Sequence, residues 1–407
     1  MPLGIGLAFS IEQKPHHRLV VVLVSSILGA IASTAVELTQ MFLPVRVSNL
    51  SDIICNSLGG YLGASLYCYR QSAISFLVAL FTLNRHQLRV ASLFKAIAWY
   101  CVLIGLTVWL LSANANLSNW EQGFYLVLGN EVTGDRPWQG VLYRCYIYDR
   151  PLEPSQVELV LRSTAQSDVL TRLPSLVAAI SDSPAIGDRP ENNLVPDLSW
   201  YGKFPTLPDR PFTAAEALEN SKPYGLALDR TRWLKSESPA RKLASQLKSS
   251  QEFSIFLEVA TRKTIQTGPA RIIALSRDVY SHNFSLGQEG TDLSFRLRTP
   301  ITGNQPTQPE FIVPDVFDSQ DRRNILITFE GKKLNFYIQN VERKYTFKFT
   351  PATSFVSMLP RKVPNWIINL ETFDVYRYRI PFYLAIAVPL LYLLAIAMFL
   401  AISPPSR

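Results

Sequence analysis

The chain has 407 residues, of which 48% are hydrophobic and 18% are charged. That length allows two or three domains, and the apolar excess argues against an ordinary soluble enzyme. The net charge is +8, but the excess of Lys and Arg lies on short segments beside apolar runs. This distribution argues against a nucleic-acid partner and indicates a membrane protein.

Four apolar stretches are each about long enough to cross a bilayer, and we predict transmembrane helices over residues 19–43, 51–69, 96–113 and 380–402. Only three of the 32 acidic residues precede residue 114, so the chain divides there into an apolar and a polar part. Residues 1–10 are apolar but too short to span, and we expect the N-terminal helix to be incomplete.

The basic residues of the apolar part predict its orientation. Loops of bacterial membrane proteins that are rich in Lys and Arg face the cytoplasm. Every predicted crossing is consistent with a cytoplasmic location of Lys14, Arg18, Arg70, Arg85, Arg89 and Lys95. We therefore predict a multi-pass protein of the inner (plasma) membrane with residues 114–379 extracytoplasmic. Arg377 and Arg379 lie on the opposite side and do not follow this rule.

A polar cluster is predicted at one mouth of the first helical hairpin. Glu37 and Gln40 share one helix face, Asp52 and Asn56 share another, and Arg46 lies in the short connector between them. Ionisable groups at membrane depth indicate a functional site. The alternative is that Arg46 only neutralises the two carboxylates and locks the turn. No nucleophile, His or metal-ligand spacing accompanies the cluster, so we predict no catalytic residue.

The run ELTQMFLPVRVSNLSDIICNSLGGYLG, preceded by MPLGIGL, resembles the VanZ-like membrane domain over residues 1–113. That family has a Glu-x-x-Gln helix end, a Pro-x-Arg connector and an Asp-x-x-x-Asn helix start. In this chain the pattern falls on Glu37, Gln40, Pro44, Arg46, Asp52 and Asn56. The founding member is associated with glycopeptide (teicoplanin) resistance, which implies no particular reaction. The missing first helix departs from the family pattern.

Beyond residue 250 the hydrophobic period becomes two, which predicts half-buried strands over residues 253–259, 293–297, 325–329, 334–338 and 345–349. Residues 330–332 (Glu-Gly-Lys) predict a hairpin turn. Two earlier segments, 124–128 and 141–148, have similar patterns. Many short strands with turn residues between them predict an all-β jelly-roll sandwich. Residues 164–196 lack alternation and predict a linker, and we read residues 351–379 as a connector to the last helix.

A second resemblance concerns this polar part. The stretch SSQEFSIFLEVATRKTIQTGPARIIALSRDVYSHNFSLGQEGTDLSFRLRTPITGNQP, followed by ILITFEGKKLNFYIQN, resembles a laminin-G-like, concanavalin A-like jelly roll. The segment NWEQGFYLVLGNEVTGDRPWQGVLYRCYIYDRPLEPSQV resembles the last strands of that family. Because the ending precedes the beginning, we expect a split or circularly permuted jelly roll, with residues 114–163 completing residues 197–350. Two separate partial domains are the alternative.

The turn at residues 129–138 (GNEVTGDRPW) supplies the candidate ligand residues of the sandwich. They combine oxygen ligands, a cation and an aromatic ring, which suit a sugar site or a calcium site: Asn130, Glu131, Asp135, Arg136 and Trp138. The alternative is a structural turn in which Asp135 pairs with Arg136 and Trp138 packs on the core.

Three further arginines, Arg271, Arg296 and Arg298, either bind an anionic ligand or form a solvated strand face. The region has no His-paired nucleophile and no strand motif of the jelly-roll glycosidases, so we do not expect an enzyme.

We therefore predict a bacterial integral membrane protein that displays a lectin-like domain for an envelope glycan or a protein partner, embedded in the lipid bilayer, with calcium as its only candidate cofactor. The alternative is a membrane enzyme or transporter of lipid-linked or amphipathic, glycopeptide-like substrates that acts through the polar cluster.

Overall fold

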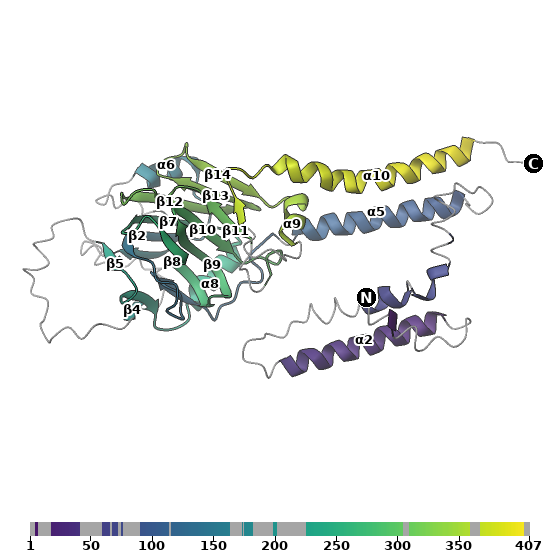
Figure 1. Cartoon of the computed structure of the whole chain (residues 1–407), viewed down its shortest axis with the longest axis horizontal. Coiled ribbons are helices and arrows are strands. Elements are labelled where there is room, and N and C mark those ends of the chain that lie inside the picture. Colours follow the sequence, from purple (N-terminus) through teal and green to yellow (C-terminus); the bar gives the residue numbers. More distant parts are fainter. Residues whose placement is uncertain are drawn as a thin grey trace, which may run out of the picture. The chain divides into compact units, whose positions relative to one another are not determined.

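The structure is a computed structural model of the chain (Figure 1). It describes residues 5–6, 18–40, 59–65, 67–71, 75, 90–113, 115–162, 173, 175–181, 198–201, 225–303, 309–358 and 367–402. The chain divides into two compact units, one made of Met1–Val102 with Val388–Arg407 and the other of Leu103–Ala387.

Three long helices occur at positions where the sequence predicts spans: α2 (Arg18–Gln40), α5 (Val90–Ala113) and α10 (Val375–Ile402). By length and composition, Leu93–Ser112 of α5 and Arg379–Met398 of α10 are long and apolar enough to cross a membrane, and α2 contains a shorter apolar stretch, Val20–Ala32. The predicted span over residues 51–69 lies partly outside the described residues, and its described part is helical from residue 59. The packing of these helices into a membrane bundle stays a prediction.

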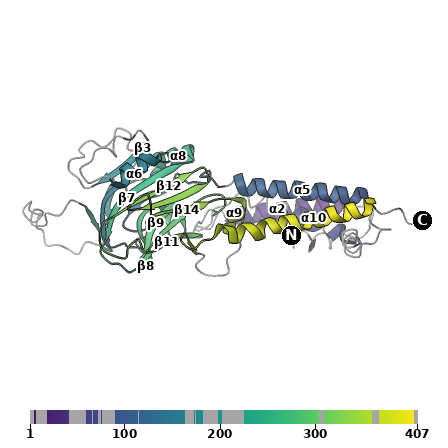
Figure 2. The same cartoon turned by 90° about the horizontal axis from the view of Figure 1, so that it is seen from above.

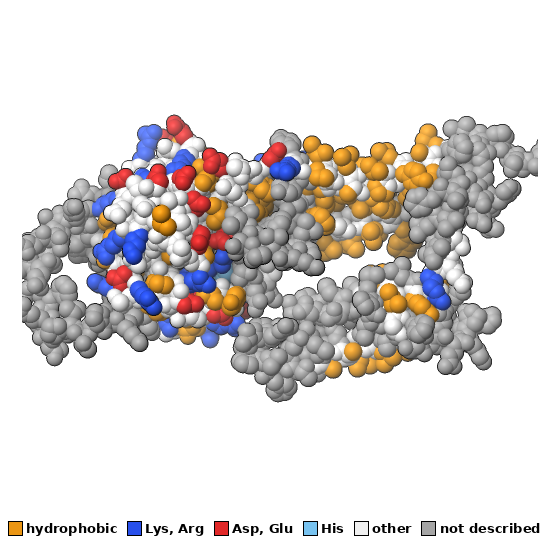
Figure 3. Space-filling view, in the orientation of Figure 1, with side chains coloured by type: hydrophobic (Ala, Val, Ile, Leu, Met, Phe, Trp, Pro, Cys, Tyr) orange, Lys and Arg blue, Asp and Glu red, His pale blue; other side chains and the backbone are white. Residues whose placement is uncertain are grey.

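The apolar helices expose large hydrophobic side chains. Trp99 and Trp109 of α5 are 74% and 62% exposed, and Leu391 of α10 is 62% exposed. In Figure 3 hydrophobic side chains cover the helical segments, whereas charged side chains of both signs are scattered over the sandwich. Helices that are apolar all round are typical of segments surrounded by lipid.

The second unit contains a β-sandwich of two mostly antiparallel sheets, and its described residues include the short helices α6, α8 and α9 (Figures 1 and 2). The eight-stranded sheet has the order β15-β11-β10-β9-β8-β1-β6-β4. The seven-stranded sheet has the order β14-β13-β12-β7-β2-β3, and β5 also pairs with β2. The strands are β1 (Tyr125–Leu128), β2 (Gly140–Tyr148), β3 (Leu176–Ser181), β4 (Leu198–Tyr201), β5 (Leu226–Leu228), β6 (Trp233–Ser236), β7 (Phe253–Thr261), β8 (Gln266–Asp278), β9 (Ser281–Gly290), β10 (Asp292–Leu297), β11 (Glu310–Val313), β12 (Arg323–Glu330), β13 (Lys333–Ile338), β14 (Lys344–Lys348) and β15 (Ile367–Asn369).

The two early strands lie inside the sheets formed by later residues. Strand β1 pairs with β8 on one edge and β6 on the other. Strand β2 pairs with β7 along its length and shares its other edge between β3 and β5. The early segment and the later strands therefore belong to one sandwich and are not two partial domains.

Two parts of the chain predicted as a linker and a connector contain sheet strands. The predicted linker over residues 164–196 contains β3, which is apolar and buried because the core lies on one side and α6 (Pro154–Arg162) packs near the other. A strand buried on both faces shows no alternation. The predicted connector over residues 351–379 contains α9 (Pro351–Met358) and β15, which pairs in parallel with β11.

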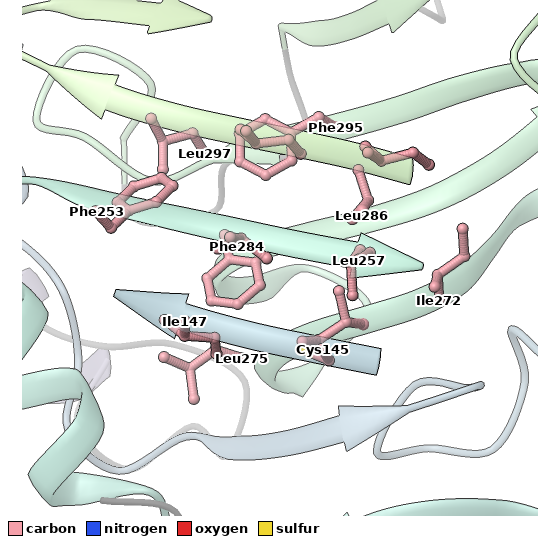
Figure 4. Close-up of a cluster of buried hydrophobic side chains, with 14 of the residues drawn as sticks. Cys145, Ile147, Phe253, Leu257, Ile272, Leu275, Phe284, Leu286, Phe295 and Leu297 are labelled. Carbon is pink, nitrogen blue, oxygen red and sulfur yellow. The ribbon is translucent and has the colours of Figure 1, made fainter. Parts of the chain in front are cut away.

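The core lies between the two sheets and is rich in aromatic rings. Figure 4 shows side chains of β2 and β7 meeting those of β8, β9 and β10, with Phe253, Phe284 and Phe295 among them. The ring centroids of Phe253 and Phe329 are 5.6 Å apart. Helix α8 (Arg241–Ser250) adds Leu243 and Leu247 to this core. Helix α6 covers the outer face of the seven-stranded sheet.

The predicted hairpin at residues 330–332 is confirmed, since β12 and β13 pair directly and Glu330 faces Lys333 across the turn. Its two central residues, Gly331 and Lys332, have φ angles of 48° and 74°. Positive φ at both positions is the geometry of a type I′ turn, which matches the twist of the flanking strands.

This turn generates a stability prediction. Gly331→Ala should lower the free energy of unfolding of the sandwich by about 1 kcal/mol, because a Cβ disfavours the left-handed region. Gly123→Ala is the matched control, since Gly123 has open space around it and no positive φ. Thermal unfolding followed by tryptophan fluorescence measures both, and equal midpoints for the two variants would contradict the turn geometry.

Candidate functional site

A pocket of about 500 Å³ lies at the rim of the sandwich, where the 129–138 turn meets two other loops. The 129–138 turn contributes Asp135, and Gln139 follows it directly before β2. The β5–β6 turn contributes Arg230, and the β7–β8 loop contributes Lys263 and Ile265. The pocket therefore depends on three chain segments that are far apart in the sequence.

The surface of the pocket is mixed in character. Asp135, Arg230 and Lys263 are exposed, which gives one anion and two cations around the opening. Ile265 is 70% exposed and is an apolar element among them. Asp135 is held by a hydrogen bond of 2.5 Å from the Thr133 hydroxyl. Such a surface suits a polar ligand that carries hydroxyl or anionic groups and one apolar face.

Two buried glutamines fix the floor of the pocket. Gln288 Oε1 accepts hydrogen bonds from Trp138 Nε1 at 3.0 Å, from Gln266 Nε2 at 2.9 Å and from Thr261 Oγ1 at 2.8 Å. The backbone N–H of Gln139 donates to Gln266 Oε1 at 2.8 Å. A buried network whose members are satisfied is rigid, so these glutamines lock the β7–β8 loop to the start of β2.

Trp138 lies below the pocket rather than in it, because its side chain is fully buried. The ring fits over Gly140, where a Cβ atom would lie 2.2 Å from Trp138 Cη2 and 2.7 Å from the Ala260 carbonyl oxygen. Glycine is therefore required beneath this ring. The face of Trp138 is not available for stacking on a sugar, and its role is to support the pocket.

Asn130 organises the turn itself. Its side-chain Oδ1 accepts hydrogen bonds from the backbone N–H groups of Glu131 and Arg136, both at 2.9 Å. The guanidinium of Arg136 donates to the Gly268 carbonyl at the start of β8. Among the residues that the structure describes, no ion pair joins Asp135 to Arg136, so the expected pairing within the turn is wrong. Asp135 remains directed to the pocket.

Glu131 and Arg271 form a buried ion pair next to this turn, with Glu131 Oε2 3.6 Å from Arg271 Nε and both side chains at most 1% exposed. The Ser276 hydroxyl donates to the other carboxylate oxygen. Burial raises the pKa of Glu131, and the nearby Arg271 opposes this shift. Burial lowers the pKa of Arg271 to about 10. Each charge therefore depends on the other in a dry environment.

The two other candidate arginines are also paired. Arg296 lies 2.9 Å from Glu310, and Arg298 lies 3.1 Å from Glu121. Arg271 and Arg298 are 1% and 3% exposed, so the expectation of a solvated strand face is wrong for both. The acidic partners come from distant segments, which local periodicity does not reveal.

Of the five candidate residues in the turn, the structure places one at the pocket and four in its support. Asp135 lines the pocket, whereas Asn130, Glu131 and Trp138 are buried and Arg136 holds the turn to β8. Six pocket residues outside the 129–138 turn were not predicted: Gln139, Arg230, Lys263, Ile265, Gln266 and Thr267. An apolar Ile265 within the polar loop TRKTIQTGP is the one sequence signal that points to this loop.

The membrane polar cluster is described only in part. Glu37 and Gln40 lie in the last turn of α2, but their side chains, together with Arg46, Asp52 and Asn56, lie outside the described residues. Their convergence stays a prediction. Within the described part of the chain, no group of three or more His, Cys, Asp or Glu is arranged to hold a metal ion.

The buried ion pair generates a prediction. Glu131→Gln and Arg271→Met should each lower the free energy of unfolding by about 3–5 kcal/mol, because each leaves the other charge buried without a partner. The double variant should recover part of that loss. Denaturation followed by tryptophan fluorescence measures the cycle. As a control, Glu158→Gln breaks an exposed pair with Arg162 and should change stability by less than about 0.5 kcal/mol. Additive losses in the double variant would show that the two residues do not interact.

Comparison with known proteins concerns the first part of the chain. Residues 1–82 match the VanZ/LLP1 family, and this segment contains the whole polar cluster. No curated protein and no solved structure matches the chain. The match covers 82 of 407 residues, so the VanZ-like character holds for this segment.

Proposed function

We propose that this chain is a multi-pass protein of the bacterial inner membrane that displays its sandwich outside the cytoplasm, where the sandwich binds an envelope glycan. The VanZ/LLP1 match and two apolar helices support the membrane part. The antiparallel sandwich and its rim pocket support the binding part. The laminin-G-like resemblance, with the last strands placed first, supports a lectin-like origin of this sandwich.

The pocket is the observation that carries the proposal. Its volume is in the range of small-ligand sites, and its side chains offer donors and acceptors to hydroxyl groups. Arg230 and Lys263 favour glycans that carry carboxylate or phosphate groups. Ile265 offers an apolar surface for the C–H face of a sugar ring. No catalytic step is part of this proposal, since the pocket acts by binding.

The rigid floor increases the affinity that such a small site can reach. Because Gln266 and Gln288 hold the β7–β8 loop before any ligand arrives, little conformational entropy is lost on binding. The Lys263 carbonyl accepts from Gln288 Nε2 at 2.9 Å, so the backbone of this pocket residue is fixed while its side chain stays available.

Variants of the pocket test the proposal. Lys263→Ala and Arg230→Ala should each weaken glycan binding about tenfold, because a hydrogen bond to a charged group contributes roughly 1.5–3 kcal/mol. The measurement is a binding screen of the whole chain in nanodiscs against envelope glycans and peptidoglycan fragments, run with calcium and again with chelator. Loss of binding in chelator alone would assign calcium a role at Asp135.

Lys333→Ala is the matched control, since Lys333 is an exposed lysine on β13 outside the pocket. It should bind as the unmodified chain does. A correctly folded chain that binds no glycan would overturn the proposal and favour a protein partner. Glycan binding that survives both pocket substitutions would place the site elsewhere on the sandwich.

A second candidate function rests on the family match, which covers every residue of the polar cluster. In this alternative the membrane domain acts on lipid-linked or amphipathic, glycopeptide-like substrates through Glu37, Arg46 and Asp52.

Substitutions in the cluster separate the two functions. Glu37→Gln and Asp52→Asn should abolish any protection against teicoplanin that the chain gives a susceptible bacterium, because they remove the negative charges around Arg46. Glu12→Gln, an acidic residue of the same region outside the cluster, is the control. The minimum inhibitory concentration measures the effect, and protection that is lost only in pocket variants would reject the alternative.

A further inference from the structure

Helix α5 enters the sandwich through a very short connection. It ends at Ala113, and Ala115 and Leu117 are already buried in the sandwich core. The backbone N–H of Leu117 donates to Gln251 Oε1 at 2.8 Å, which fixes the segment to the end of α8. The apolar stretch of α5 ends at Ser112, and the three residues from there to Ala115 extend no more than about 10 Å.

Helix α10 is joined to the sandwich in the same way. Phe373 packs on Phe347 of β14 with ring centroids 5.5 Å apart, and α10 begins at Val375. The apolar stretch of α10 begins at Arg379, four helical residues later, which corresponds to about 6 Å along the helix. Neither apolar stretch is separated from the folded sandwich by a flexible linker.

Both connections reach the same end of the sandwich, which we call the membrane end. Leu117 is held by Gln251, two residues before β7 begins at Phe253. Phe253 stacks on Phe329, and the Phe329 ring lies 6.4 Å from that of Phe349, just before α9. Phe349 and Phe347 are also in ring contact, at 5.0 Å. Figures 1 and 2 both show α9 at this end of the sandwich, and Figure 1 shows it beside the start of α10.

Phe355 of α9 lies at the depth where α10 becomes apolar. Its side chain is 43% exposed, and its ring contacts that of Phe382 at 5.6 Å. Phe382 is three residues inside the apolar stretch that begins at Arg379, or about 5 Å along the helix. A large exposed aromatic side chain at that depth meets lipid rather than water if α10 crosses the bilayer.

The polar groups at this level suit lipid headgroups. Arg377 and Arg379 are exposed on the first turns of α10, and Tyr383 is 41% exposed one turn further on. Tyrosine is enriched at membrane interfaces, and arginine side chains there extend to phosphate groups. Lipid phosphates would give the two arginines that depart from the orientation rule negatively charged partners.

We propose that the membrane end of the sandwich lies in the headgroup layer of the outer leaflet, with Phe355 at the hydrocarbon boundary and Arg377 and Arg379 on lipid phosphates. This inference rests on the proposed function only in requiring that α5 and α10 cross the bilayer. The ligand pocket lies at the far end, because β7 runs from the membrane end to Thr261 beside the pocket. Eight steps of about 3.3 Å separate the two ends of β7, so the pocket lies up to about 27 Å further from the membrane.

Spin labels on the whole chain in nanodiscs test this placement. Phe355→Cys carries the label at the membrane end, and Ile265→Cys carries it at the pocket as the control. Cys55, Cys68 and Cys101 are replaced by Ala, whereas Cys145 stays, because burial raises the pKa of its thiol to about 12 and keeps it unreactive. The ratio of collisions with oxygen to collisions with a water-soluble nickel chelate should be severalfold higher at position 355 than at position 265.

Equal ratios at the two positions would overturn the proposal. Phe355→Trp gives a second measurement without a label, since lipids brominated near the headgroup should quench its added fluorescence. In nanodiscs with phosphatidylglycerol, the double variant Arg377→Gln with Arg379→Gln should lower the oxygen-to-nickel collision ratio at position 355. An unchanged ratio would show that the two arginines do not contribute to the lipid contact. These measurements use no glycan, so a sandwich that binds none can still rest on the bilayer, and the two proposals fail separately.

Discussion

The β-sandwich depends on the pairing of β2 with β7. Its register runs from Gly140 opposite Thr261 to Tyr148 opposite Ser254. At one end this pairing brings Gln139 beside the β7–β8 loop, where the Arg262 N–H donates to its carbonyl at 3.0 Å, and so sets the wall of the pocket. Beyond the bulge between Leu142 and Arg144, this pairing turns Cys145 and Ile147 into the core and Tyr146 and Tyr148 toward α6. One strand register thus determines the core, the outer helix and the pocket together.

Polar burial is the second constraint, and it explains why so few of the candidate residues face solvent. The turn at residues 129–138 is held from within by Asn130, by the Glu131–Arg271 pair and by Trp138. Burying such groups is unfavourable unless they are paired, and the pairing requires that loop and strands adopt one arrangement. The hydrogen bonds of Asn130 and Trp138 and the Glu131–Arg271 ion pair therefore hold the turn in one arrangement. Polar and aromatic residues of kinds that often bind ligands here stabilise the turn that contains Asp135.

Hydrophobic alternation predicted β1, β2, β7, β10, β12, β13 and β14, because each places alternate apolar side chains in the core, and a Gly at the turn predicted the β12–β13 hairpin. Alternation did not predict the other strands. Strand β3 was missed because its residues are buried on both faces, and β15 because three residues show no period. The turn was proposed as a candidate site from its composition, and the alternative in which Trp138 packs on the core agrees with the burial of this side chain. Its hydrogen-bond partner Gln288, 150 residues away, was not predicted. Arg230 and Lys263 lie in irregular loops. These loops are neighbours in space only because of the order of the strands in the sheets, which the sequence pattern does not reveal. The polar cluster was predicted by motif and stays a prediction, and the family match concerns residues 1–82 alone.

The order of the strands has a consequence for how this protein is made. Tyr146 of β2 pairs with Phe256 of β7, 110 positions later in the chain. If α5 is inserted into the membrane first, β1 and β2 are exported beside the bilayer with unpaired edges. They remain unpaired until β8 and β7 have been synthesised and exported. Closing so long a loop is slow, and unpaired strands are prone to associate with other chains. On that route, assembly of the sandwich would depend on the progress of export, and a pause in translation before β7 would leave β1 and β2 unpaired at the membrane surface.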